Sequence, residues 1–248
     1  QYGATLNTWS TGGNMDTGRK TLGGVGTQTA ALAFGGKISP GPESALTETY
    51  NGSSWAEVND LNNARNYLAG CGVQTSALAF GGRNPAITDI GEKTESWNGT
   101  NWTNVNDLNT ARRLLAGSGA TNTAGLAFGG TPPGGLAVTE LWNGTNWTAT
   151  TTMSVPRKRA GAAGATNTAA LAFGGESPGT YNATEEFNTS VPIANTWQTG
   201  GNLNTARNFL GGAGTQTAAL AFGGNPDTAK TEKYNGTNWT EVNDLNTV

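Results

Sequence analysis

Residues 77–82 read Ala-Leu-Ala-Phe-Gly-Gly, and this stretch decides the fold because near copies of it recur along the whole chain. The phenylalanines of the five copies are Phe34, Phe80, Phe128, Phe173 and Phe222. They are separated by 46, 48, 45 and 49 residues. Self-similarity with a period of about 20 to 50 residues is the signature of repeat architectures. The chain is therefore expected to be a fivefold array.

Three further residues keep a fixed order around each copy of this motif. An Arg precedes it, at Arg19, Arg65, Arg112, Arg157 and Arg207. A Glu placed two residues before an aromatic side chain follows it, at Glu48, Glu95, Glu140, Glu185 and Glu232. A Trp comes last, at Trp55, Trp102, Trp147, Trp197 and Trp239. These landmarks predict one domain over residues 1–248, with repeats that start near 19, 65, 112, 157 and 207.

Each repeat is expected to form four short strands. Continuous apolar runs such as 77–80 suit strands that are buried on both faces, and turn residues bound them at each end. Asn-Gly, as at Asn98-Gly99, separates the Glu strand from the Trp strand, and this dipeptide is a strong hairpin signal because both residues tolerate a positive φ. Four antiparallel strands repeated around an axis make a propeller. The predicted fold is all-β, a β-propeller of five four-stranded blades.

The order Arg, apolar strand, Gly-Gly, Glu-x-aromatic and Trp resembles the kelch repeat over nearly the whole chain. Residues 214–224, Gly-Thr-Gln-Thr-Ala-Ala-Leu-Ala-Phe-Gly-Gly, are also similar to Thr/Asn/Gly-rich kelch-like arrays of phage and microbial surface proteins. The resemblance implies a propeller. It implies no single function, since one fold carries many different sites.

The way in which the propeller closes stays open at this point. Residues 2–13 match residues 187–201, so residues 1–12 supply an extra outer hairpin that no inner hairpin accompanies. Five blades are expected, with six as the alternative if the chain is a segment of a longer array. An unmatched hairpin exposes a strand edge, and this predicts self-association through the terminal strands.

The composition argues against several classes of function. Only 12% of the residues are charged, and the net charge of −3 offers no basic face for nucleic acid. The chain has no His, the commonest general base and metal ligand, and its one cysteine, Cys71, aligns with Ser118 and Ala163, which indicates a packed small residue. No apolar stretch approaches the roughly 20 residues of a membrane helix. We expect no enzyme, no cofactor, no metal site, no nucleic-acid partner and no membrane insertion.

The five Arg and the five Glu are predicted to be structural. As a ring of charges they resemble a set of ligand contacts, but a role that recurs in every blade usually serves the scaffold. Each Arg is expected to tie its blade to a Glu or to loop carbonyls, because a guanidinium carries five donors in a rigid fork.

Candidate ligand-binding residues lie in the loops. The linkers between blades, such as 60–65, are nearly constant among the repeats, whereas the loops after Gly-Gly vary, at 37–46, 83–93, 131–138, 176–183 and 225–230. Both sets should emerge on one face, and variable loops on a rigid frame are where recognition usually occurs. The candidates on this face are Arg83, Asn84, Asp89, Asp60, Asp107, Tyr181 and Asp227. Simple drift of exposed turns is the alternative explanation.

These observations favour a non-enzymatic recognition or adhesion module of a virion, tail fibre or cell surface, hence extracellular or virion-associated. A surface rich in Asn, Thr and Gly offers amide and hydroxyl groups for a neutral glycan or another surface polymer, and repeated units offer multivalency. A structural, self-assembling propeller is one alternative. A peptide-binding kelch adaptor is the other.

Overall fold

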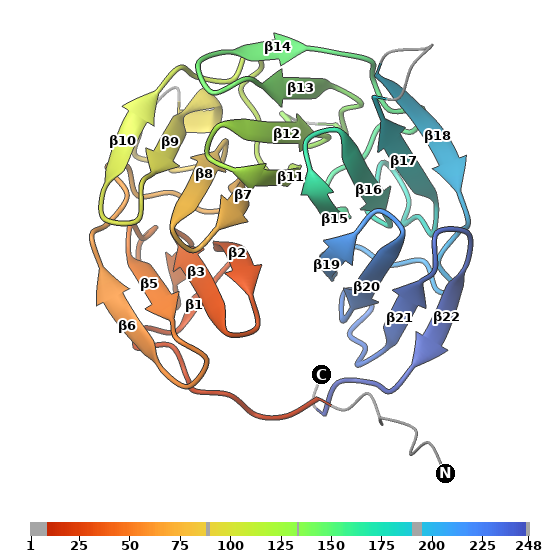
Figure 1. Cartoon of the computed structure of the whole chain (residues 1–248), viewed down its shortest axis with the longest axis horizontal. Coiled ribbons are helices and arrows are strands. Elements are labelled where there is room, and N and C mark those ends of the chain that lie inside the picture. Colours follow the sequence, from red (N-terminus) through yellow and green to blue (C-terminus); the bar gives the residue numbers. More distant parts are fainter. Residues whose placement is uncertain (1–8, 88–89, 133, 190–194, 247–248) are drawn as a thin grey trace.

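The computed structural model describes residues 9–87, 90–132, 134–189 and 195–246. It shows five four-stranded antiparallel sheets arranged around an axis, which confirms the predicted all-β propeller (Figure 1). The single helical turn in this described part is η1 (Ile90–Glu92). A short ribbon of β1 (Arg19–Lys20) and β4 (Lys37–Ile38) adjoins the first blade.

The strands follow the repeat landmarks. The first blade consists of β2 (Gly23–Thr27), β3 (Ala30–Phe34), β5 (Thr47–Tyr50) and β6 (Trp55–Val58). The second consists of β7 (Ala69–Val73), β8 (Ser76–Phe80), β9 (Thr94–Trp97) and β10 (Trp102–Val105). The third consists of β11 (Ala116–Thr121), β12 (Ala124–Phe128), β13 (Thr139–Trp142) and β14 (Trp147–Ala149). The fourth consists of β15 (Gly161–Thr166), β16 (Ala169–Phe173), β17 (Thr184–Asn188) and β18 (Thr196–Gly200). The fifth consists of β19 (Gly211–Thr215), β20 (Ala218–Phe222), β21 (Thr231–Tyr234) and β22 (Trp239–Val242).

The innermost strands are Gly- and Ala-rich because neighbouring blades converge there. A Cβ placed on Gly70 would lie 2.4 Å from the Phe34 ring, and one on Gly212 would lie 2.2 Å from the Ala162 carbonyl oxygen. Real Cβ atoms do not approach other atoms so closely, so larger residues at these positions would force the blades apart. Small residues therefore set the distance between successive blades.

Farther from the axis, a Trp of each of the last four blades fills the space beside the preceding blade. Its ring packs against the Phe of the preceding Phe-Gly-Gly motif, with ring centroids 4.9–5.1 Å apart. Its indole nitrogen donates to a buried threonine of that blade, at 3.0 Å in every case. The pairs are Trp102–Thr47, Trp147–Thr94, Trp197–Thr139 and Trp239–Thr184. The tryptophans thus join the blades by both packing and hydrogen bonding.

The repeated Arg and Glu form a buried ion pair in each blade. The nitrogen–oxygen distances lie between 2.5 and 3.1 Å, and every side chain involved is at most 2% exposed. The pairs are Arg19–Glu48, Arg65–Glu95, Arg112–Glu140, Arg157–Glu185 and Arg207–Glu232. The second carboxylate oxygen of Glu95 accepts the Asn62 backbone N–H at 2.6 Å, so the pair also holds the linker between the blades.

The ring of blades is open on one side. Innermost strands of successive blades pack together from β2 to β19, whereas in the described part of the chain no comparable packing joins β19 to β2. Figure 1 shows the first and fifth blades facing each other across this opening, with the red N-terminal segment passing along its outer side. None of the described helical segments is long and apolar enough to cross a membrane.

Candidate binding site at the axial mouth

Apart from Asn195, which precedes β18 (Thr196–Gly200), the described non-glycine residues with a positive φ, between 54° and 58°, stand at one position of each repeat. These residues are Thr21, Tyr67, Leu114, Arg159 and Phe209, each two positions after the repeated Arg. The left-handed conformation costs an L-residue about 1–2 kcal/mol, and bulky residues seldom adopt it. Strained residues of this kind cluster at functional sites and persist only where the surrounding structure imposes them.

Backbone hydrogen bonds between blades impose this conformation. The N–H of Tyr67 donates to the Thr21 carbonyl, and the N–H of Leu114 donates to the Tyr67 carbonyl, both at 2.9 Å. Arg159 and Phe209 continue the series at 2.9 and 3.0 Å. We call these five residues the axial ring. Because main-chain atoms make all four bonds, the ring fixes its backbone and leaves its side chains free to differ.

The side chains of the axial ring surround a hollow of about 180 Å³. All five line it, together with the residue that follows each, which is Leu22, Leu68, Leu115, Ala160 or Leu210. Ligand pockets usually measure about 300–1,000 Å³. The hollow therefore has room for one sugar ring or one amino-acid side chain, with the remainder of a ligand outside it.

Arg159 and Phe209 form a preorganised pair within the ring. The guanidinium carbon of Arg159 lies 4.3 Å from the centroid of the Phe209 ring, within the range of a cation–π contact. Glu176 pairs with the guanidinium and accepts a hydrogen bond from the Asn208 amide at 2.7 Å. The positive charge at the mouth is thus balanced, while Phe209 remains 45% exposed.

The axial ring lies on the face that carries the variable loops. Short antiparallel bridges join the residue before each ring position to the start of the loop that follows Gly-Gly. They pair Asn66 with Arg83, Arg113 with Thr131, Lys158 with Glu176 and Asn208 with Asn225. The expected sharing of one face by linkers and variable loops is therefore seen in the structure.

The candidate residues from the sequence are distributed unevenly over this face. Asp227 lines a second hollow of about 330 Å³ together with Phe209 of the ring. Arg83 is exposed, and the Asn84 amide donates to the Ala64 carbonyl at 2.8 Å. Tyr181 is half-buried beside Arg157, with its hydroxyl donating to the Ser177 carbonyl.

The two acidic linker candidates hold strand ends. Asp60 accepts the Thr47 backbone N–H at 3.0 Å, and Asp107 accepts that of Thr94 at 3.2 Å. Asp107 also pairs with Lys93 at 2.7 Å. Asp89 lies outside the described residues.

Sequence reasoning missed the axial ring. Its signal was the variation at a single position, since five different residue types stand between Arg-x and an apolar residue, Leu in four repeats and Ala in the fourth. That position follows the repeated Arg by two residues, close to the nearly constant part of the linker. The variation was therefore hidden beside the more variable loops.

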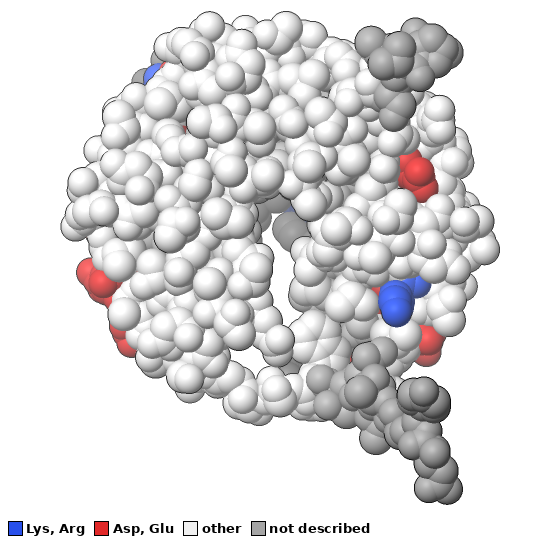
Figure 2. All heavy atoms as spheres, in the orientation of Figure 1, with Lys and Arg blue, Asp and Glu red and all other residues white. Residues whose placement is uncertain are grey.

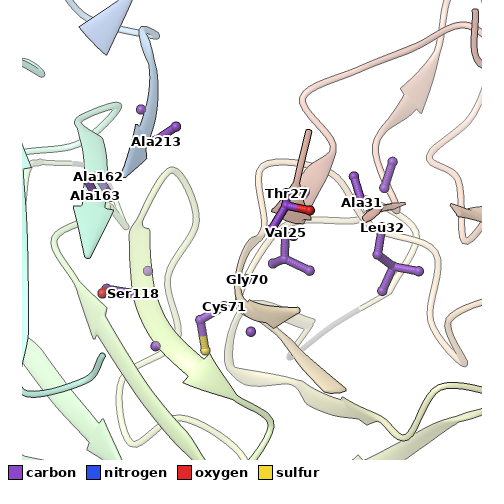
Figure 3. A pocket seen from close by; sticks show the side chains of 18 of the residues that line it. Val25, Thr27, Ala31, Leu32, Gly70, Cys71, Ser118, Ala162, Ala163 and Ala213 are labelled. Atoms are coloured by element: carbon purple, nitrogen blue, oxygen red, sulfur yellow. The ribbon is translucent and has the colours of Figure 1, made fainter. Parts of the chain in front are cut away.

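The channel along the axis is a second cavity, and its lining differs from the charged and aromatic side chains of the axial ring. A cavity of about 620 Å³ is lined by small residues of the innermost strands, among them Val25, Cys71, Ser118, Ala163 and Ala213 (Figure 3). Burial raises the pKa of Cys71 to about 12, so its thiol stays protonated at neutral pH and is a poor nucleophile. No cluster of three metal-ligating side chains occurs among the residues described.

No protein-family model matches the sequence, and no curated protein is significantly similar to it.

Proposed function

We propose that this propeller is a non-enzymatic, kelch-like recognition module of a virion, tail fibre or cell surface, and that it binds a neutral glycan at the axial mouth. The observation that carries the proposal is the axial ring, in which five strained backbones present five different side chains around one hollow. A repeated scaffold that carries a different side chain at the same position of each repeat is the arrangement expected of a binding surface.

A neutral sugar suits the chemistry of this mouth. Phe209 offers an exposed aromatic face and Tyr67 a half-buried one, and aromatic rings combine large apolar area with defined geometry. Arg159 is already paired with Glu176, so a neutral ligand need not supply an opposite charge.

Peptide binding is the second candidate, since Tyr and Arg are enriched among the residues that dominate protein interfaces. Tyr67 and Arg159 both line the hollow, and its volume also fits one side chain.

A glycan array and a peptide library, each probed with the same variants, test the proposal. Phe209→Ala should weaken glycan binding at least about tenfold, which corresponds to about 1.4 kcal/mol. Val73→Ala is the matched control, because Val73 is 40% exposed at the end of β7 remote from the ring, and should leave affinity within about twofold.

Glycan binding that is lost in Phe209→Ala and kept in Val73→Ala supports the proposal. Peptide binding with the same dependence supports the second candidate instead. Equal effects of both variants, or turnover of a bound glycan, would overturn the assignment.

A further inference from the structure

The opening between the first and fifth blades leaves the face of the fifth blade half covered. Leu32, Leu78, Leu126 and Leu171 of the first four blades are fully buried, whereas Leu220 at the same repeat position is half-buried. Phe222 is likewise half-buried, while the other four motif phenylalanines are at most 1% exposed. In the first blade, Leu32 and Phe34 are covered by Ala77, Ala79 and aromatic side chains of the second. Among the residues that the structure describes, no such set of alanines covers Leu220 and Phe222 of the fifth blade.

The outer part of a next blade is already in place beside the fifth. Trp9 packs on Phe222 with ring centroids 5.3 Å apart and planes at 62°, close to the 5.1 Å and 62° of Phe34 and Trp102. Asn246 donates through its side chain to the Trp9 carbonyl at 3.0 Å. Asn62, Asn109 and Asn204 donate in the same way to the outer-strand Trp carbonyls of the second, third and fifth blades, at 2.9–3.2 Å. Trp9 and Asn246 thus occupy the outer-strand and linker positions of a sixth blade.

The first blade forms the other side of the opening. The Gln74 amide reaches back to the carbonyls of Ala31 and Tyr50 in the preceding blade, at 3.1 and 2.7 Å. Gln216 makes the equivalent pair of bonds to the fourth blade. Gln28 holds this position in the first blade, where it is exposed and lines the opening beside Trp9.

Trp55, on the outer strand β6 of the first blade, also lies at this opening. It is half-buried, whereas the four tryptophans that pack on a preceding blade are 5–8% exposed. Two hollows of about 490 and 640 Å³ flank Trp9 and share Gln28 in their walls. The axial cavity extends to Trp55 as well. Figure 2 shows the central opening of the disk on this side of the molecule.

We propose that this opening is the seat of a sixth blade, filled by an inner hairpin of the chain's own repeat type that continues the linker at Asn246. The hairpin consists of an Arg, a Gly-rich strand and an Ala-Leu-Ala-Phe-Gly-Gly strand. Its alanines cover Leu220 and Phe222, its Phe packs on Trp55, and its second-strand carbonyl accepts from Gln28. Each contact repeats one that already joins the other blades.

A second copy of the chain is a poorer occupant. In the described residues every inner strand is already paired inside its own blade, so a second copy offers the same two half-covered faces and no free hairpin. Contact between two such copies leaves Gln28 and Trp55 without the partners that the repeat provides.

The test compares the chain with an extended protein in which the sequence of residues 112–130 is repeated after Val248. The same residues in scrambled order form the control extension. Leu220→Cys, in a Cys71→Ala background, reports on the vacant face through its rate of thiol labelling. Protection by the hairpin should slow labelling at least about tenfold relative to the scrambled extension. Thr148→Cys, exposed on the outer strand β14, should label equally in both proteins.

If the extended protein does not fold, a synthetic peptide of residues 112–130 is added to the unextended Leu220→Cys protein instead, and saturable slowing of labelling is the expected result. Equal labelling with the repeat and scrambled sequences in a folded protein, or no slowing by the peptide, would overturn the proposal. So would protection of Leu220→Cys in an unextended dimer, because a second copy would then fill the opening.

Discussion

The guanidinium of Arg207 donates to the carboxylate of Glu232 at 2.8 Å, and both side chains are completely buried. The other terminal nitrogen of Arg207 donates to the carbonyls of Gly223 and Lys230, at 2.8 Å each. One side chain therefore fastens the linker to the Gly-Gly turn and to the start of the third strand. Removal of one partner from such a pair leaves an uncompensated buried charge, which costs far more than the intact pair contributes.

Arg207→Ala should lower the free energy of unfolding by about 3–5 kcal/mol. Arg112→Ala should cost less, about 1–3 kcal/mol, because Arg112 lies 3.1 Å from Glu140 and donates to one carbonyl at 3.3 Å. Urea denaturation of both variants measures the difference. Lys233→Ala, at an exposed lysine of β21, is the control and should stay within about 0.5 kcal/mol. Equal losses for the two arginines would contradict the ranking.

Thr94→Val should destabilise the protein by about 1–3 kcal/mol, because it leaves the buried indole N–H of Trp147 without its acceptor. Thr231 occupies the same position in the fifth blade, where its hydroxyl is buried and has no partner in the described structure. Thr231→Val should therefore be close to neutral. Thermal unfolding of the two variants side by side checks this, and similar shifts for both would show that the hydrogen bond is not what matters.

The raised pKa of Tyr234 predicts that the folded protein loses stability at high pH. Burial, together with a 2.5 Å hydrogen bond to Glu186, raises the pKa of Tyr234 to about 12, whereas an unfolded tyrosine titrates near 10. The folded protein then holds more protons than the unfolded one between these values. The stabilisation is complete below pH 10 and is lost as the pH rises through about 12.

The comparison with Tyr234→Phe isolates this contribution. At pH 8 the variant should be less stable by about 1.5–3 kcal/mol, the usual worth of a hydrogen bond to a charged group. The difference should shrink between pH 10 and 12, because only the wild-type protein loses the tyrosine contribution. Urea denaturation at a series of pH values measures it, and a difference that stays constant over that range would refute the prediction.

The strain in the axial ring predicts an unusual response to glycine. Thr21→Gly relieves the left-handed conformation of a β-branched residue, whereas Thr148→Gly on β14 relieves nothing. Both variants carry the same entropic cost of glycine. Thr21→Gly should therefore be less destabilising than Thr148→Gly by about 1–2 kcal/mol. Equal losses measured by chemical denaturation would mean that residue 21 is not strained in solution.

The blades could be predicted because their signals are local. Phe80-Gly81-Gly82 and Asn98-Gly99 mark strand ends through glycines whose φ is positive, a property that can be read within a few residues. The repeated Trp is an equally local landmark, and the structure places the ring of Trp102 against Phe34 of the preceding blade.

The backbone conformation of the axial ring could not be predicted because its cause is not local. The conformation of Tyr67 accompanies hydrogen bonds to Thr21 in one neighbouring blade and to Leu114 in the other, both more than forty residues away. A bulky residue gives no sequence signal of a positive φ. The sequence left the closure of the propeller open for the same reason, since closure depends on how the first and fifth blades lie relative to each other.

The hydrogen bonds of the axial ring have a consequence for how such a protein can change over evolutionary time. Because Leu114 and Arg159 are linked through main-chain atoms, a mutation at either codon alters what the mouth presents and leaves this hydrogen bond between the blades in place. The left-handed backbone conformation costs free energy at each of these positions, whichever of these side chains it carries. Natural variants can therefore diversify the rim one residue at a time, and selection for new ligands can proceed with little risk of unfolding.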